Sequence, residues 1–432
     1  MSGSEKFVGG ENLRTLSLDR LRVDQKLRFP IHGQDGVLLL SAESVVTERV
    51  LEALRQRGID TIVVHREETA VSIPIESRGR FTEVRPPWPG TRVAVDTNGT
   101  MRLDRSLGDE IQRALEAHEP PFMLDIPNLG TQPYEESLTR ELYHTHEQCV
   151  GKLRSLQYSI IAKQSEGHRG IHRLVDEYLQ IMVRDLDLFS SFATAPHAGH
   201  YPNRHSLHVA MLSLAMGVRA GLGSESMYSL GLGAILHDIG MLRVPRSIWS
   251  QKTPLSVSQR LDIMMHPIYS LDALEGITEI GDDVRCIVYQ VHERAMGQGY
   301  PRQVPSELIH PLAKIVAVAD VYVAMVSDRP YRPALLPYKA MEGVIKLVQS
   351  GWFDPETARL LLETLSLYPV GSYVRLNDRR LGKVVRSNGS TYDRPILRVW
   401  PERTPPSEET GEMLDMCEHA ELKVVEALPA PP

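Results

Sequence analysis

Histidine and aspartate residues recur at similar intervals through the middle of this 432-residue chain. The set that could do chemistry is His205, His237, Asp238, His266, His292 and Asp320. Each lies in or beside an apolar run with helical spacing, where an unpaired imidazole or carboxylate carries a desolvation penalty. Taken singly, each would more often be a hydrogen-bonded core residue. The steps between them are roughly 30 residues, one helix plus a turn, so antiparallel helices would present them to a common centre.

The predicted chemistry at that centre is metal binding. Imidazole and carboxylate ligands together suit iron, manganese, nickel or zinc, and an aspartate can bridge two ions through its two oxygens. The adjacent pair His237 and Asp238 is the densest in the set. We therefore expect one or two divalent transition metal ions, with Asp238 as the bridging ligand.

The elements that must position these residues are mostly helices, so the predicted fold class is mostly α. A helical bundle domain is expected over 191–365, where apolar helical segments alternate with proline- and glycine-containing connections. Before it, residues 71–190 predict a proline-rich linker and a long helical region, with helical spacing at 103–116 and again at 135–192. That region would either pack as an ordinary helix or couple partners.

The two ends of the chain predict small β-containing units. Residues 1–70 read as an α+β module, with two apolar runs around "GQDG", a helix that ends at Gly58 and a strand at "IDTIVVH". Residues 366–432 predict an antiparallel β segment and tail, because "YVRLNDRRLGKVVRSNG" alternates apolar and polar residues between turn signals, and "ELKVVEAL" would add a strand.

The composition excludes several classes of protein. A net charge of -7 argues against binding to a nucleic acid polymer. No apolar run is long enough for a membrane span, and the N-terminus lacks the apolar core of a signal peptide, so we expect a cytoplasmic protein. The three cysteines are far apart, which predicts buried thiols and no disulfide framework.

Four short motifs carry a resemblance to a known family. They are "HDIG" at 237–240, "HER" at 292–294, "GQGYP" at 297–301 and "ADVYVAMVSDRPYR" at 319–332. In order and spacing they resemble the HD-GYP family, bacterial members of the HD metal-phosphohydrolase superfamily that hydrolyse cyclic di-GMP. The resemblance covers roughly 200–365, and "YPVGSYVRLNDRRLGKVVR" is similar to a β segment that often follows this domain.

The resemblance implies roles for individual residues. One metal would be held by His205, His237, Asp238 and Asp320, and a second by Asp238, His266 and His292. Asp238 and Tyr300 would be catalytic. The residues implied in substrate binding are Gly299, Tyr300, Pro301, Arg329 and Arg332, the arginines because their forked donors suit phosphate. The implied partner is cyclic di-GMP, and protein partners in signalling or a homodimer through the long helix remain open.

Four positions depart from the family pattern. Val291 stands where the family usually has a second metal-binding histidine, and Met296 replaces an aspartate of the following loop. Met241 occupies the place of a lysine that meets substrate phosphate. Tyr201, four residues before His205, replaces a glutamate that supplies a third metal in some members, and little supports His197 or His200 as substitutes.

These losses fall mainly on the second metal, which leaves three functions open. The first is a cyclic di-GMP phosphodiesterase of weakened activity, with water or His208 completing the second metal's coordination. The second is a catalytically degenerate protein that binds cyclic di-GMP or a partner and signals through the N-terminal module. The third is hydrolysis of another phosphorylated nucleotide.

Overall fold

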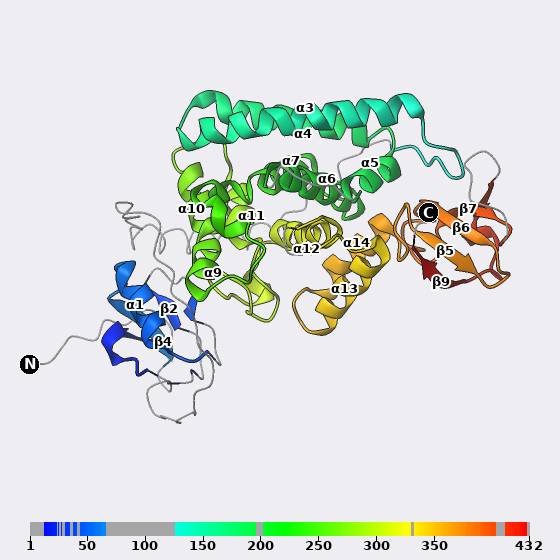
Figure 1. Cartoon of the computed structure of the whole chain (residues 1–432). Helices are drawn as coiled ribbons and strands as arrows, with labels where there is room; N and C mark the ends of the chain where they lie inside the picture. Colours follow the sequence, from blue (N-terminus) through cyan, green and yellow to red (C-terminus); the bar gives the residue numbers. More distant parts are fainter. Residues whose placement is uncertain are drawn as a thin grey trace, which may run out of the picture.

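The computed structural model describes residues 13–65, 126–195, 202–329, 332–402 and 411–429, with short gaps in the first range at 24, 26, 28–30, 35–37 and 41–43. The described chain is mostly helical, as predicted, with one small sheet toward each end (Figure 1). The predicted linker, the predicted helix at 103–116, and His197, His200 and Tyr201 lie outside the described residues.

The N-terminal module is a four-stranded antiparallel sheet with one helix. Its strands, in the order β1-β4-β2-β3, are β1 (Leu13–Ser17), β2 (Ile31–Gly33), β3 (Leu38–Leu40) and β4 (Thr61–His65). Helix α1 (Glu48–Gln56) begins after Thr47, whose side chain accepts the Val50 N–H. The chain leaves the helix at Gly58, whose φ of +74° favours glycine. The predicted helix and three strands are confirmed, whereas β1 was not predicted.

The module packs against one helix of the middle region, α9 (Val257–Met264). Leu261 of α9 is buried in the apolar core of the module. Arg57 donates to the Ser258 carbonyl at 3.0 Å and forms an ion pair with Asp262. The His32 side chain also bonds to Gln303 beyond the "GYP" loop. The N-terminal module therefore contacts two segments that border the predicted centre.

The region 135–192 forms three helices, not one long one. They are α3 (Glu136–Ile161), α4 (Ser165–Met182) and α5 (Leu186–Ala193). The chain reverses at Lys163, which has φ of +58° and whose Nζ binds the carbonyls of Asp272 and Glu275 at 2.6 and 2.9 Å. The helix predicted as a coupling element is therefore folded back as a hairpin that packs on the domain (Figure 1).

The helices between residues 203 and 365, some of which carry the predicted ligands, form the centre of the molecule. They are α6 (Asn203–Arg219), α7 (Ser224–Leu236), η3 (Ile239–Arg243), α8 (Arg246–Trp249), α9, α10 (His266–Leu274), α11 (Asp282–Gln290), α12 (Pro311–Val326), α13 (Pro337–Gln349) and α14 (Pro355–Leu365). Helices α6 and α12 are apolar around most of their circumference and are therefore buried. One continuous apolar core extends from Leu138 to Leu365, so the α3–α4 hairpin shares it.

The predicted antiparallel C-terminal sheet is confirmed. Its order is β8-β7-β6-β5-β9, with β5 (Tyr373–Leu376), β6 (Leu381–Arg386), β7 (Ile396–Trp400), β8 (Glu412–Asp415) and β9 (Val424–Leu428). Arg386 of β6 makes a buried two-pronged ion pair with Asp185, with both bonds at 2.9 Å. This pair joins the sheet to the helical domain.

Two further expectations can be compared with the structure. Cys149 and Cys286 are buried thiols as predicted, but Cys417 is exposed, because it lies in a short 3-10 helix at the edge of the sheet. Across the part of the chain that the structure describes, every helix is too short or too polar to cross a bilayer.

Candidate metal centre

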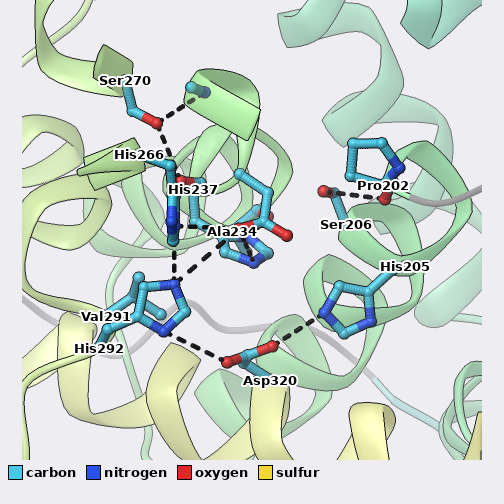
Figure 2. A network of polar contacts seen from close by, with 12 residues as sticks. Pro202, His205, Ser206, Ala234, His237, His266, Ser270, Val291, His292 and Asp320 are labelled. Carbon is cyan, nitrogen blue, oxygen red and sulfur yellow. Dashed lines mark hydrogen bonds and ion pairs between the residues drawn. The ribbon is translucent and has the colours of Figure 1, made fainter. Parts of the chain in front are cut away.

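The six predicted ligands lie together where α6, α7, α10, α11 and α12 meet, and Figure 2 labels all of them except Asp238. His205 is in the first turn of α6, and Asp320 is in the buried middle of α12. His237 and Asp238 form the joint between α7 and η3. His266 opens α10, and His292 follows α11 by two residues. Most of the ligands therefore sit at helix ends, where a short change of direction aims several side chains inward.

The ligand atoms fall into two overlapping groups, each with its donor atoms within 4.8 Å of one another. The first group is His205, His237 and Asp238, and the second is Asp238, His266 and His292. Asp238 is common to both. Asp320 lies beside the first group, with Oδ1 2.9 Å from His205 Nε2, and also approaches His292 Nδ1 at 3.8 Å. The arrangement suits two ions that share one carboxylate.

The hydrogen bonds of two imidazoles direct the same ring nitrogen of each toward Asp238. His237 Nδ1 lies 2.8 Å from the Ala234 carbonyl, and His266 Nδ1 lies 2.6 Å from the Ile263 carbonyl. A carbonyl only accepts, so Nδ1 carries a proton in both rings, and Nε2 is the ring atom directed at Asp238. These Nε2 atoms face Asp238 Oδ1 at 3.5 and 3.2 Å.

A buried imidazole nitrogen and a carboxylate oxygen that face each other need a proton or a metal ion between them. His237 Nε2 is fully buried and has no hydrogen-bond partner in the described chain. In the second group, His266 Nε2 and His292 Nε2 approach to 2.9 Å. The donor set of imidazoles and carboxylates therefore fits one or two divalent transition metals.

The electrostatics of the centre keep its ligands in the states that metals need. Burial lowers the pKa of His292 to about 4, so this imidazole is neutral at pH 7. Burial also lowers the pKa of His205, and the charge of Arg329 adds to the effect. Although burial opposes ionisation of Asp238, the imidazoles around it hold its pKa well below the usual range.

The loop with the "GYP" motif covers the second group. The ring of Tyr300 stacks on His292 with centroids 4.8 Å apart, and it meets His266 edge-on at 6.2 Å. Burial raises the pKa of the Tyr300 phenol, which therefore keeps its proton. A Cβ on Gly299 would collide with main-chain atoms of His292 and Glu293, so the close approach of the loop requires glycine there. Pro301 follows as a buried residue.

The two predicted phosphate-binding arginines have different surroundings. Arg329 lies near enough to His205 to influence its pKa. The Arg332 guanidinium donates to the carbonyls of Ala324, Met325 and Pro333, at 2.6, 3.0 and 3.2 Å. It therefore caps the end of α12 and shapes the loop after it.

The three departures from the family pattern that lie within the described residues have different environments. Val291 is fully buried in the main apolar core beside His292 (Figure 2). Met241 is 2% exposed and packs with Val244 and Ile248 in a small apolar cluster. Met296 is 70% exposed. Two of the three substitutions are thus absorbed into apolar packing.

Several residues that support the site gave little or no signal in the sequence. The Ser270 hydroxyl donates to the His237 carbonyl at 3.1 Å and accepts the Gly240 N–H at 2.8 Å, which ties the His237–Asp238 joint to α10. A Cβ on Gly240 would collide with the His266 carbonyl. Gly240 lies within "HDIG" and could have been noticed, whereas Ser270 belongs to no motif. The buried His208 bonds to the Ala193 carbonyl, outside both ligand groups.

Comparison with known proteins bears on this centre. Residues 176–357 match the family model described as "HD domain". A cyclic di-GMP phosphodiesterase of Thermotoga maritima is 31% identical over 344 residues, which cover 76% of this chain and 89% of that protein. One of Pseudomonas aeruginosa is 29% identical over 276 residues, 63% of this chain and 66% of the relative, just under two thirds of its length.

A third relative has a different named substrate. A 3'3'-cGAMP-specific phosphodiesterase of Vibrio cholerae is 31% identical over 166 residues, which cover 38% of each chain. The Thermotoga match spans most of both proteins, and it accompanies the "HDIG" and "GYP" motifs around a two-part histidine and aspartate centre. The chain belongs to the HD-GYP family.

Proposed function

We propose that this HD-GYP protein is a metal-dependent phosphodiesterase that hydrolyses cyclic di-GMP, with turnover weakened at the second half of its centre. The observation that carries the proposal is the pair of ligand groups that share Asp238. Two bound divalent ions polarise a phosphodiester and make water a nucleophile at neutral pH. The substrate class follows from the names of the relatives.

The residues of this chain would divide the work as follows. The imidazoles of His205 and His237, with Asp320, would hold the first ion, and those of His266 and His292 the second, with Asp238 between them. Tyr300 keeps a phenolic proton and stacks on His292, so it offers an O–H donor and a ring to the nucleotide. Arg329, the arginine nearer the centre, would meet phosphate, and the capping bonds of Arg332 favour a role in holding its loop.

The proposed weakness has two sources. Met241 is packed in an apolar cluster and offers no charge to phosphate, and a charge-assisted hydrogen bond is worth about 1.5–3 kcal/mol. Val291 offers no ligand, so His266, His292 and Asp238 would hold the second ion without a fourth protein group. Changes beyond the inner ligands already cost about 10- to 100-fold in metal affinity or activity.

A second candidate is a cyclic di-GMP-binding signalling module without turnover. The observation that favours it is the contact of the N-terminal module with α9, through Leu261 and the Arg57–Asp262 pair, directly before His266. A change at the centre could be reported through this contact to a protein partner.

The deciding experiment measures turnover and binding together. Purified protein is loaded with iron, manganese, nickel or zinc and incubated with cyclic di-GMP, 3'3'-cGAMP or a linear dinucleotide, while affinity is measured by calorimetry. Hydrolysis of cyclic di-GMP with at least one ion supports the enzyme. Tight binding without hydrolysis supports the signalling module, and a protein that binds neither metal nor nucleotide contradicts both.

A further inference from the structure

We propose that Glu293 is a positioning residue that fixes residues 299–304 over the metal centre and so sets the affinity for nucleotide. The choice of nucleotide rests on the proposed function, whereas the positioning of the segment does not. Glu293 directly follows the ligand His292, yet its carboxylate belongs to neither ligand group.

Three consecutive backbone amides converge on this carboxylate. Oε1 accepts the N–H of Arg302 at 2.6 Å and that of Gln303 at 3.2 Å, and Oε2 accepts the N–H of Val304 at 3.2 Å. Glu293 is only 2% exposed. A buried carboxylate that receives several backbone donors forms strong hydrogen bonds and fixes the conformation of the donor segment.

The backbone of the segment is held in a conformation that it would not adopt by itself. Gln303 has φ of +58°, in the left-handed region that costs energy for residues other than glycine. Its N–H is one of those bound by Glu293. On the other side of the loop, Tyr300 N–H donates to the His292 carbonyl at 3.1 Å, and Gly299 crosses the 292–294 main chain in close contact. The loop is therefore fixed at both ends to the ligand-bearing turn.

Arg294, whose charge also acts on Glu293, makes its hydrogen bonds to main-chain carbonyls. The Arg294 guanidinium donates to the carbonyls of Val291 and Glu293, at 3.0 and 2.6 Å, and lies over the rings of Trp352 and Phe353. The hydrogen bonds of the Glu293 carboxylate therefore go to the 302–304 segment. Because that segment continues from Tyr300, which stacks on His292, loosening it would displace the Tyr300 ring and hydroxyl from the centre.

The test compares Glu293→Gln with the same change at Glu307, an exposed residue beyond the segment. Glutamine has the same shape but only one acceptor oxygen, so at least one amide loses its partner. In metal-loaded full-length protein we expect hydrogen exchange of the Arg302, Gln303 and Val304 amides to become at least about 10-fold faster. Affinity for cyclic di-GMP should weaken by about 10-fold or more, because small displacements of positioning groups are costly. Metal content should be unchanged, and Glu307→Gln should change none of these.

Three outcomes would overturn the proposal. One is unchanged exchange at the three amides in Glu293→Gln. Another is faster exchange with undiminished nucleotide affinity, and the last is a parallel loss of metal, which would mean that Glu293 acts through His292. If the wild-type protein binds no nucleotide, the proposed function fails, but the exchange rates still decide whether Glu293 fixes the loop. Should Glu293→Gln not fold, rapid exchange of these amides in the wild-type protein would contradict the proposal.

Discussion

The two halves of the metal centre share one carboxylate but differ in what surrounds them. The first half, with His205 and His237, lies between α6, α7 and α12, and Asp320 stands 2.9 Å from His205 as a further candidate ligand. The second half, with His266 and His292, has Val291 in the position where the family places another histidine, and this valine is part of the apolar core. The two halves therefore share Asp238, but the first has one more candidate ligand, Asp320, than the second. The difference shows that an apolar side chain at position 291 is compatible with the fold around the centre, because Val291 packs in the apolar core.

Removal of the shared carboxylate should produce the largest effect. Asp238→Ala takes a ligand from both halves, so we expect metal content below about a tenth of the wild-type value and a loss of turnover of more than about 100-fold, beyond what outer residues cost. Metal analysis by mass spectrometry and a cyclic di-GMP hydrolysis assay measure both. Asp282→Ala, an exposed aspartate of α11, serves as the control. Similar metal content in Asp238→Ala and the wild-type protein would refute the shared site.

Single histidine substitutions should show which half of the centre binds its ion more strongly. His237→Ala should remove the ion of the fuller ligand set and reduce turnover by about 100-fold, whereas His266→Ala should remove an ion already held weakly and reduce it by about 10-fold. The metal-to-protein ratio of each variant, measured after the same dialysis, tests this order. Equal losses in the two variants would mean that the halves are equally strong.

Restoring the family residues should raise activity. Val291→His adds an imidazole to the second half, and Met241→Lys adds a cation for phosphate, so the double variant should hold more metal and hydrolyse cyclic di-GMP about 10-fold faster. Without metal, burying the new polar groups should cost about 1–3 kcal/mol of unfolding free energy. Thermal unfolding with and without added manganese, alongside the hydrolysis assay, measures both effects. A double variant that binds nucleotide but stays inactive would favour the signalling module.

Removing the Ser270 hydroxyl, which supports the His237–Asp238 joint between the halves, should have a moderate effect. Ser270→Ala removes the hydroxyl that bonds both the His237 carbonyl and the Gly240 N–H, leaving a buried donor unsatisfied. We expect a loss of about 1–3 kcal/mol in unfolding free energy. We also expect a severalfold weaker affinity for metal. Denaturant unfolding and metal titration provide the numbers, and Ser270→Thr, which keeps the hydroxyl, should retain more affinity than Ser270→Ala.

Breaking the contact between the N-terminal module and α9 should have the smallest effect. Arg57→Ala breaks the pair with Asp262 on α9, which leads into His266, so any change should fall on the second half. Partly exposed ion pairs contribute about 0.2–1 kcal/mol, so turnover should change less than about fivefold. Arg55→Ala is the matched control, because its pair with Asp19 lies within the module. Identical metal content and turnover in both variants would show that this contact does not reach the centre.

Much of the fold was predictable from local pattern. Thr47 and Gly58 mark the two ends of α1, and the alternation in β5 and β6 gives one buried residue in every two. The chain reversal at Lys163 was not predictable, because the residues around it are common in helices. The reversal depends on the carbonyls of Asp272 and Glu275, in and just after α10, more than one hundred residues away. Strand β1, which pairs with β4, was not predicted.

The candidate site divides in the same way. Residue type and spacing by themselves singled out the six candidate ligands, because metal chemistry requires particular side chains and helices impose a regular step between them. The positions 241 and 291 were noticed only through the resemblance to the HD-GYP family. Only the tertiary structure decided that Ser270 braces the His237–Asp238 joint, that Arg332 caps α12 while Arg329 lies near His205, and that Glu293 gathers three amides. The physical reason is that the side chains of Ser270, Arg332 and Glu293 bind main-chain groups, which nearly every residue carries, so the sequence does not mark the partner.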